Sequence, residues 1–282
     1  MTNFIPKATG SQADVAAKVD VSTVHSGYFS KKENSDLFTE KGIRPILNNL
    51  PNSLKYVDFG GAHGHLASEV KYFLNQSGRS VNAMVIDGNE RILSKARELG
   101  LSTLLGNLDE VQVCGLDLAT MRAVLHYNSH EMQKQIMINI FNSLRTGGLL
   151  IHQYSSGNEE NCRLRSAINN LPSLERGGNG DYRWITTAEC SQLTASVGFK
   201  NCFITSSNPN SWTVSEQWER FHKSSNLNAD DLGKKRKIFF ADASTLIEDF
   251  ISSYGAVHLG VEKLPGDYRI HYEYPIIVSR KP

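Results

Sequence analysis

Short apolar runs alternate with longer stretches of helical periodicity along most of this chain. Runs of strand length lie at residues 56–59, 81–86, 102–105, 116–121, 149–154, 199–206 and 272–278. The stretch after the first run carries apolar residues at the spacing of one helix face, namely Leu66, Val70, Phe73 and Leu74. Strands that alternate with helices in this way predict an α/β fold, with a mostly parallel sheet and flanking helices.

Two parts of the pattern fall outside such a sheet. Residues 1–50 precede the first strand and become helical in pattern toward their end, which predicts an N-terminal helical cap. Residues 208–268 separate the sixth run from the last and also show helical spacing, so we expect a helical lid inserted between strands six and seven. The core is then formed by residues 51–207, and residues 269–282 supply its final strand.

The first predicted strand runs directly into a glycine-rich turn. Residues 58–64 read DFGGAHG, and a helix is expected to begin at His65. Glycine has no Cβ, so this backbone can pass close to a ligand, and the free N–H groups of the following helix point toward that ligand. The turn therefore predicts a nucleotide-binding site.

An acidic residue follows the turn at the spacing of a ribose-binding acid. Asp87 ends the second predicted strand, 23 positions after Gly64 (87 − 64 = 23), and Gly88 comes next. An acid at the end of the second strand of a βαβ unit can accept hydrogen bonds from both ribose hydroxyls.

These features together resemble the class I S-adenosylmethionine-dependent methyltransferases. Residues 58–64 are similar to the first motif of that family, D-x-G-x-G-x-G, with Ala62 in place of the middle glycine. Asp87 falls where the family keeps its ribose acid; residues 116–126 resemble its fourth strand, and residues 144–151 resemble the segment that leads into its fifth. The resemblance implies a Rossmann-like, seven-stranded, mostly parallel sheet and S-adenosyl-L-methionine as the cofactor.

The resemblance also assigns cofactor-binding residues by position. They are Asp58, Gly60, Gly61, Ala62 and Gly64 in the turn, Asp87 and Gly88 at the ribose position, Asn107 and Leu108 at the adenine position, and Arg122 after the fourth strand. Asp109 lies two residues beyond Asn107. Because an amide can accept from the adenine amino group as a carboxylate does, we favour Asn107 for that contact.

Two residues near the expected carboxyl edge of the sheet are candidates for catalysis. His126 follows the fourth strand, and a neutral imidazole near pH 7 can accept a proton from a substrate hydroxyl or amine. The alternative is that His126 packs beside the cofactor and orients a loop. Tyr154 ends the fifth strand at the same edge, where it can act in catalysis or bind substrate.

Aromatic residues outside the core are candidates for substrate binding. Tyr28 and Phe29 precede the first strand and can cover a bound ligand, and Trp218 lies in the predicted lid. Aromatic residues at helical spacing are more often buried in a core, so ordinary packing remains the alternative for each of them.

Composition excludes several classes of function. The 282 residues carry a net charge of +1, which offers no electrostatic footprint for nucleic acid or an anionic membrane. The four cysteines form no C-x-x-C pair, so neither a metal site nor a disulfide framework is predicted. No apolar run reaches the length that a signal peptide or a membrane span requires, so we expect a cytoplasmic protein. We also expect a monomer or a weak homodimer.

The sequence leaves several functions open. The leading hypothesis is methyl transfer from S-adenosylmethionine to an oxygen or nitrogen of a small molecule, and secondary metabolism is one setting for such a reaction. A second is a cyclase, lyase or aminocarboxypropyl transferase that uses the same cofactor and releases methylthioadenosine. A third is a protein that binds the cofactor without turnover. An NAD-linked dehydrogenase is disfavoured because the glycine spacing is not G-x-G-x-x-G.

Overall fold

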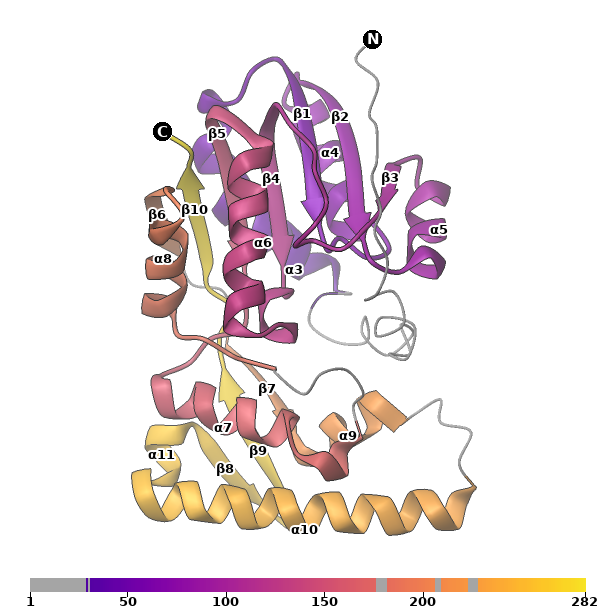
Figure 1. Cartoon of the computed structure of the whole chain (residues 1–282), viewed down its shortest axis with the longest axis vertical. Helices are drawn as coiled ribbons and strands as arrows, with labels where there is room; N and C mark the ends of the chain where they lie inside the picture. The colour runs from indigo at the N-terminus through magenta and orange to yellow at the C-terminus, as the bar shows by residue number, and fades with distance from the viewer. Residues whose placement is uncertain (1–28, 30, 176–181, 206–208, 223–227) are drawn as a thin grey trace.

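A computed structural model describes residue 29 and residues 31–175, 182–205, 209–222 and 228–282 of the chain. Two layers are visible in Figure 1, with a large sheet and its helices above and a smaller unit below. Within the described residues, no helix combines the length and the apolar composition that a membrane crossing requires.

The upper layer is built on a seven-stranded sheet with the strand order β3-β2-β1-β4-β5-β10-β6. Its strands are β1 (Ser53–Phe59), β2 (Ser80–Asp87), β3 (Ser102–Leu105), β4 (Leu116–Arg122), β5 (Leu144–Gln153), β6 (Lys200–Thr205) and β10 (Ile276–Arg280). Strand β10 is antiparallel to both of its neighbours, and the other pairs are parallel. The predicted α/β fold with a mostly parallel, seven-stranded sheet is therefore confirmed.

Helices cover both faces of this sheet. One face carries α3 (Lys32–Phe38), η2 (Thr39–Ile43), η3 (Arg44–Asn49), α4 (His65–Gln76) and α5 (Glu90–Glu98), and the other carries α6 (His130–Ser143) and α8 (Thr187–Ser196). Figure 1 shows α6 and α8 in front of the strands. The helix ends follow local sequence signals: Ser129 caps α6, and Thr186 forms a capping box with Glu189 at the start of α8.

The register of the central strands places three chain segments at one edge. Phe59 at the end of β1 pairs with Ile86 of β2 and with Met121 of β4. The residues that follow these three strands therefore emerge side by side at the carboxyl edge, where ligands bind in open α/β sheets.

The lower layer holds the predicted helices and also a sheet that the pattern did not predict. Between β6 and β10 the chain forms β7 (Asn210–Thr213), α9 (Val214–His222), α10 (Ala229–Tyr254), α11 (Ala256–Leu259), β8 (Val261–Leu264) and β9 (Asp267–Tyr272). The three strands form an antiparallel sheet in the order β7-β9-β8. Helix α7 (Glu159–Asn169), which follows β5, packs against α10 and α11.

One sequence-based boundary is corrected by this arrangement. Residues 269–272, which we assigned to the final core strand, belong to β9 and pair with β7 and β8, while the core strand begins only at Ile276. Strand β8 was not predicted because it is four residues long and its two middle residues, Glu262 and Lys263, are exposed.

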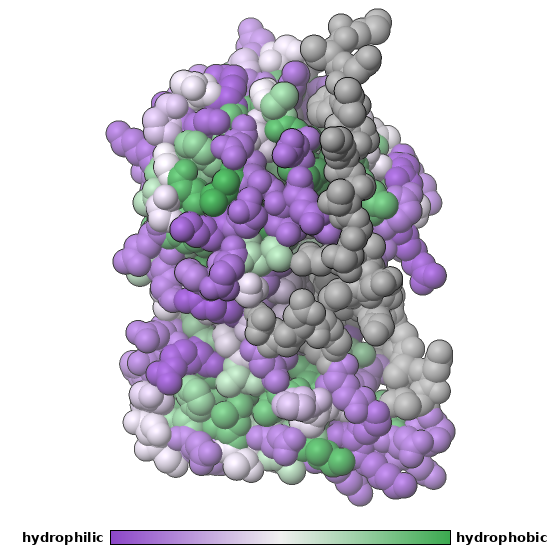
Figure 2. All heavy atoms as spheres, in the orientation of Figure 1, coloured by the Kyte–Doolittle hydropathy of each residue, from purple (hydrophilic) through white to green (hydrophobic). Residues whose placement is uncertain are grey.

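Both layers have apolar cores, and Figure 2 shows that apolar residues also gather on the surface of the lower layer.

Candidate functional site

A cavity of about 310 Å³ lies at the carboxyl edge of β1, β2 and β4. Among the predicted cofactor-binding residues, all but Gly64 line it, namely Asp58, Gly60, Gly61, Ala62, Asp87, Gly88, Asn107, Leu108 and Arg122. The cavity lining also includes Phe29, Ile92, Asp109, Val124, Tyr127 and Asn128. The fold thus brings together segments that are far apart in the chain.

The glycine turn forms one wall of the cavity with its bare backbone. Gly60 has a φ of +67°, and a Cβ built on it would lie 2.4 Å from Cγ2 of Val124. A Cβ on Gly61 would lie 2.6 Å from Oδ2 of Asp58. Both positions therefore require glycine, the first for its conformation and both for space. Gly64, at a φ of +78°, has a packing role instead, because a Cβ built on it would meet the side chain of Leu101.

Asp87 ties the turn to the second strand. Its Oδ2 accepts a hydrogen bond of 3.1 Å from the amide of Ala62, and its Oδ1 accepts one of 3.0 Å from the amide of Asn89. Burial raises the pKa of this carboxyl group, and the backbone hydrogen bonds oppose that rise. Ala62 stands at a φ of +50°, so the residue that replaces the family's middle glycine keeps a left-handed backbone.

Asp58 places a second carboxyl group in the cavity. The side chain is 1% exposed, and its Oδ1 accepts a 2.6 Å hydrogen bond from the hydroxyl of Thr120. Its Oδ2 has no hydrogen-bond partner within the part of the chain that the structure describes. Burial raises the pKa of Asp58 to about 6. A buried oxygen of this kind is complementary to a ligand that brings a donor or a positive charge.

Arg122 connects the cavity to the N-terminal elements. Its guanidinium donates to Oγ of Ser35 at 3.2 Å and to the backbone oxygen of Phe29 at 3.3 Å. It also lies 4.9 Å above the centre of the Phe29 ring. The cavity lining therefore includes a cation and an aromatic ring in addition to its carboxyl groups.

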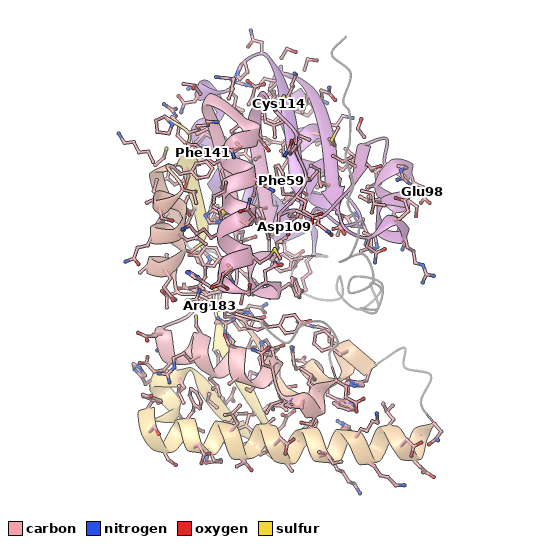
Figure 3. The ribbon with its side chains drawn as sticks, viewed as in Figure 1. Phe59, Glu98, Asp109, Cys114, Phe141 and Arg183 are labelled. Carbon is pink, nitrogen blue, oxygen red and sulfur yellow. The ribbon has the colours of Figure 1, made fainter. Side chains whose placement is uncertain are left out.

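The predicted adenine position lies at the end of β3. Asn107 makes one long side-chain contact, 3.5 Å from Nδ2 to Oε2 of Glu110, and the backbone oxygen of Leu108 accepts a 3.1 Å bond from Asn139. Asp109 also lines the cavity, and burial raises the pKa of its carboxyl group. In Figure 3 Asp109 lies beside α6 in the upper layer. Asn107 and Asp109 thus both line the cavity, and which of them would contact a base stays a prediction.

The predicted catalytic residues do not line the cavity. His126 lies in the turn η4 (Leu125–Tyr127), stacked on Trp184 at 4.8 Å and beside Tyr127 at 4.1 Å between ring centres. Tyr154 is 2% exposed in the core between the sheet and α8, where burial raises its pKa. The geometry of His126 agrees with the alternative in which it orients a loop.

The predicted substrate-binding aromatics lie elsewhere or cannot be placed. Trp218 is 2% exposed in the core of the lower layer, stacked on His222 at 3.6 Å and on Phe239 at 5.5 Å. Tyr28 lies outside the described residues. Sequence reasoning missed Tyr127 and Asn128, which line the cavity directly after His126. Their place at the end of the fourth strand was the available signal.

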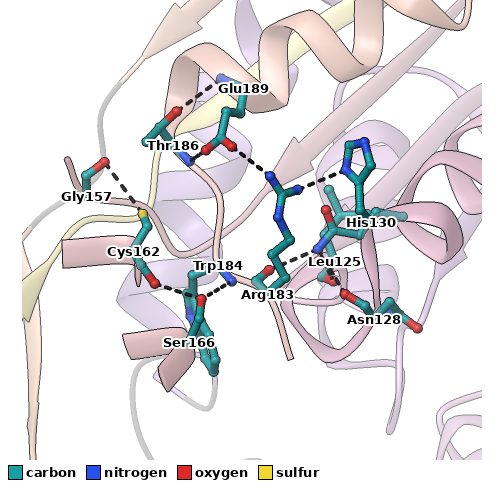
Figure 4. Close-up of polar contacts among 11 residues, drawn as sticks. Leu125, Asn128, His130, Gly157, Cys162, Ser166, Arg183, Trp184, Thr186 and Glu189 are labelled. Atoms are coloured by element: carbon teal, nitrogen blue, oxygen red, sulfur yellow. Dashed lines mark hydrogen bonds and ion pairs between the residues drawn. The ribbon is translucent and has the colours of Figure 1, made fainter. Parts of the chain in front are cut away.

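The turn η4 is held from outside the cavity by the chain near Arg183, as Figure 4 shows. The Arg183 amide donates to the backbone oxygen of His126 at 3.2 Å, and its guanidinium contacts both Glu189 and His130. The amide of Trp184 donates to Oγ of Ser166 on α7. Figure 3 places Arg183 between the two layers, so these contacts join α7 and η4 across the boundary.

Among the described residues, no group of three His, Cys, Asp or Glu side chains gathers that could hold a metal ion.

Comparisons with solved structures identify the fold. A candidate methyltransferase from Bacillus halodurans C-125 is 14% identical, with a TM-score of 0.64 over 89% of this chain and 99% of that one. Phosphoethanolamine N-methyltransferase 2 of Haemonchus contortus, with phosphomonomethylethanolamine and S-adenosylhomocysteine bound, is 10% identical, with a TM-score of 0.54 over 97% of this chain and 61% of that one.

The same fold is found in a protein with a different reaction. The [4+2]-cyclase SpnF is 14% identical, with a TM-score of 0.51 over 88% of this chain and 80% of that one. No protein-family model and no curated protein sequence match the chain.

Proposed function

We propose that this chain, which has the class I S-adenosylmethionine-dependent methyltransferase fold, binds S-adenosylmethionine and methylates an oxygen or nitrogen of a small molecule. The observation that carries this proposal is that a buried carboxyl group, Asp58, and a half-buried one, Asp87, line one cavity beside a bare glycine turn. A nucleoside joined to a cationic amino acid is complementary to that arrangement.

The cavity residues fit the parts of this cofactor. Asp87 would accept from the ribose hydroxyls, and the unpartnered Oδ2 of Asp58 would accept from the ammonium group of the methionine part. Arg122, which also lines the cavity, would pair with the methionine carboxylate. The glycines at 60 and 61 would let the backbone approach closely.

The sulfonium group of this cofactor supplies an activated methyl group together with its leaving group. The protein then has to hold the acceptor atom in line with that methyl group, and orientation of this kind can account for much of the acceleration. Phe29, Tyr127 and Asn128 line the cavity where an acceptor could reach it. The proposed role of these side chains is to position the acceptor and exclude water.

The proposal is tested by titration calorimetry with S-adenosylhomocysteine, followed by incubation with S-adenosylmethionine and identification of the nucleoside formed. Saturable binding with one molecule per chain is the expected result, and its absence would overturn the proposal. Methylthioadenosine released without an acceptor would favour a cyclase or lyase that acts on the cofactor itself. A reaction other than methylation is the second candidate, because SpnF has this fold and is a [4+2]-cyclase.

A further inference from the structure

Two alanines that line the cavity hold a backbone conformation that alanine rarely adopts. Ala62 has a φ of +50° and Ala123 has a φ of +57°. Among the described residues, the only other non-glycine residue with a positive φ is Glu175 at +48°, and it does not line the cavity. This left-handed conformation crowds the Cβ of an L-residue against its own backbone, whereas glycine adopts it freely. Both alanines therefore carry a conformational strain that glycine would avoid.

Backbone hydrogen bonds explain the conformation of these residues. The amide of Ala62 donates to Oδ2 of Asp87 at 3.1 Å, and the amide of Ala123 donates to the backbone oxygen of Gln153 at 2.8 Å. Glycine has the same amide donor and would form the same bonds. These contacts therefore require the backbone conformation and leave the methyl group of each alanine unexplained.

Packing within the protein does not account for the two methyl groups either. Neither Ala62 nor Ala123 belongs to any of the apolar clusters that the described residues form. Ala62 is 9% exposed, Ala123 is half-buried, and both border the cavity. Strained residues of this kind gather at ligand sites, where the strain is part of the function. The two methyl groups are therefore candidates for contact with a ligand.

The two alanines lie on adjoining walls of the cavity. Phe59 and Met121 are paired at the ends of β1 and β4, so the turns that follow these strands begin side by side. A Cβ built on Gly60 in the first turn would lie 2.4 Å from Cγ2 of Val124 in the second, so the turns are in contact. One ligand in the cavity would therefore meet both turns.

The neighbours of the two alanines indicate which part of the ligand they meet. Ala62 is bonded to Asp87, and Ala123 directly follows Arg122 in the chain. If the proposed function holds, on which this inference rests, Asp87 binds the ribose of S-adenosylmethionine and Arg122 binds its carboxylate. The sulfur and the methylene groups beside it connect these two parts of the cofactor. This segment has no hydrogen-bond donor, so a methyl group can contact it without leaving a polar group unpaired.

We infer that Ala62 and Ala123 determine specificity for the alkyl group on the sulfur of the cofactor. Their methyl groups narrow the cavity beside the sulfur, so a sulfonium that carries a methyl group fits and one that carries a larger group is rejected. One extra methylene in a close-fitting pocket changes binding about tenfold or more. Alanine is then kept at both positions, despite its strain, because glycine would leave the site too wide.

The test measures the binding of three cofactor analogues that differ at the sulfur. S-adenosylhomocysteine carries no added group there, S-adenosylmethionine carries a methyl group and S-adenosylethionine carries an ethyl group. Titration calorimetry gives their dissociation constants for the wild type, Ala62→Gly, Ala123→Gly and the double variant. In the wild type the ethyl compound should bind about tenfold weaker than the methyl compound. Each glycine should reduce this difference, and the double variant should bind the two compounds about equally.

Thermal unfolding separates a role in specificity from a role in packing. Glycine relieves the left-handed strain, so both single variants should melt at or above the wild-type temperature. Their affinity for S-adenosylhomocysteine should nevertheless fall about fourfold, the value of one buried methyl contact. A packing role predicts the reverse, namely a lower melting temperature with an unchanged preference for the methyl compound over the ethyl compound.

Glu175→Gly is the matched control, because Glu175 has the same left-handed backbone and lies outside the cavity. The substitution also removes an ion pair with Lys235, but the two side chains are 45% and 35% exposed, so this loss should matter little. This variant should keep all three wild-type dissociation constants. A changed preference in this variant would show that the effect of glycine is not confined to the cavity, and would contradict the inference.

The same titrations distinguish failure of this inference from failure of the proposed function. No binding of S-adenosylhomocysteine by the wild type would count against the proposed function. Intact binding of S-adenosylhomocysteine, with equal wild-type affinities for the methyl and ethyl compounds, would count only against the role of the two alanines. A wild-type preference that the double variant retains in full would also overturn that role.

Discussion

The hydroxyl of Thr120 donates a 2.6 Å hydrogen bond to Oδ1 of Asp58, and this bond joins the ends of β4 and β1 beneath the cavity. The phenol of Tyr56 lies 2.7 Å from the same hydroxyl. One carboxylate oxygen is thus fixed by the core and the other is left for a ligand. The protonation state of Asp58 should therefore control how well a cationic ligand binds.

Cofactor binding should depend on pH through Asp58. The pKa of this buried carboxyl group is raised from 3.8 to about 6, so the contribution of the group to folding stability is full below its ordinary pKa and is lost as the pH rises through about 6. Binding of the ammonium group needs the ionised carboxylate and changes in the opposite direction. We expect the affinity for S-adenosylhomocysteine to fall about tenfold per unit below pH 6.

Calorimetry between pH 5 and pH 8 measures this dependence. Asp58→Asn keeps an acceptor for Thr120 but cannot ionise, so its affinity should be lower at pH 7 and nearly independent of pH. A wild-type affinity that stays constant over the range would show that Asp58 does not contact the charged group.

Replacement of Asp87 should weaken cofactor binding without unfolding the protein. Asp87→Ala removes the acceptor for the ribose hydroxyls and leaves the amide of Ala62 without its partner, at an expected cost of about 1–3 kcal/mol in binding free energy. Asp242→Ala on α10 serves as the control, since Asp242 is exposed and does not line the cavity. Unchanged affinity in Asp87→Ala would refute the ribose assignment.

Two glycines with similar backbone angles allow the effect of space to be separated from the effect of conformation. Gly60 and Gly78 have φ values of +67° and +79°, but a Cβ on Gly78 meets nothing within 4 Å. Gly78→Ala should cost about 1 kcal/mol of folding stability, the penalty for a left-handed alanine, and leave cofactor affinity intact. Gly60→Ala adds the collision with Val124 at the cavity wall, so it should lower both stability and affinity. Chemical denaturation and calorimetry on the pair measure the two effects, and equal behaviour of both variants would contradict this account.

Trp218 should matter for stability and not for binding. Its ring is buried against His222 and Phe239 in the lower layer, so Trp218→Ala should lower the free energy of unfolding by about 3–5 kcal/mol. The affinity of the folded variant for S-adenosylhomocysteine should remain that of the wild type. Weaker binding of S-adenosylhomocysteine by a variant of unchanged stability would indicate that Trp218 contributes to the binding site.

A phenylalanine at position 126 should distinguish stacking from proton transfer. His126→Phe keeps a flat ring against Trp184 and Tyr127 but removes both ring nitrogens, so a loop-orienting role predicts nearly wild-type thermal stability and cofactor affinity. A large loss of turnover with unchanged affinity would identify His126 as a base.

The sequence was sufficient to predict the sheet and the meeting of the glycine turn with Asp87 because both depend on local signals. The turn at residues 58–64 needs glycine for backbone reasons, and Asp87 is placed by the length of the intervening helix. Both signals can be recognised in a single sequence. The structure brings Asp58, Gly60 and Asp87 to one cavity as expected.

The surroundings of the predicted catalytic and substrate-binding residues could not be predicted in the same way. Periodicity indicates that Trp218 or Tyr154 is buried, but it does not say against which element, and each proved to lie in a core. The contact of Arg165 with Trp184 and Tyr272 joins three segments that only the fold brings together. Helical spacing also predicted the lid, but strands as short as β8 carry too little alternation to be recognised.

The position of β10 in the sheet has a consequence for synthesis of the protein. This strand is bonded to β5 on one side and to β6 on the other, with Ile276 opposite both Gln153 and Thr205. On the ribosome, β5 and β6 emerge well before β10, because β7, α9, α10, α11, β8 and β9 are translated between β6 and β10. During that interval each presents an unpaired edge that can join another chain, so nascent protein should be most prone to aggregate while the insertion is being made.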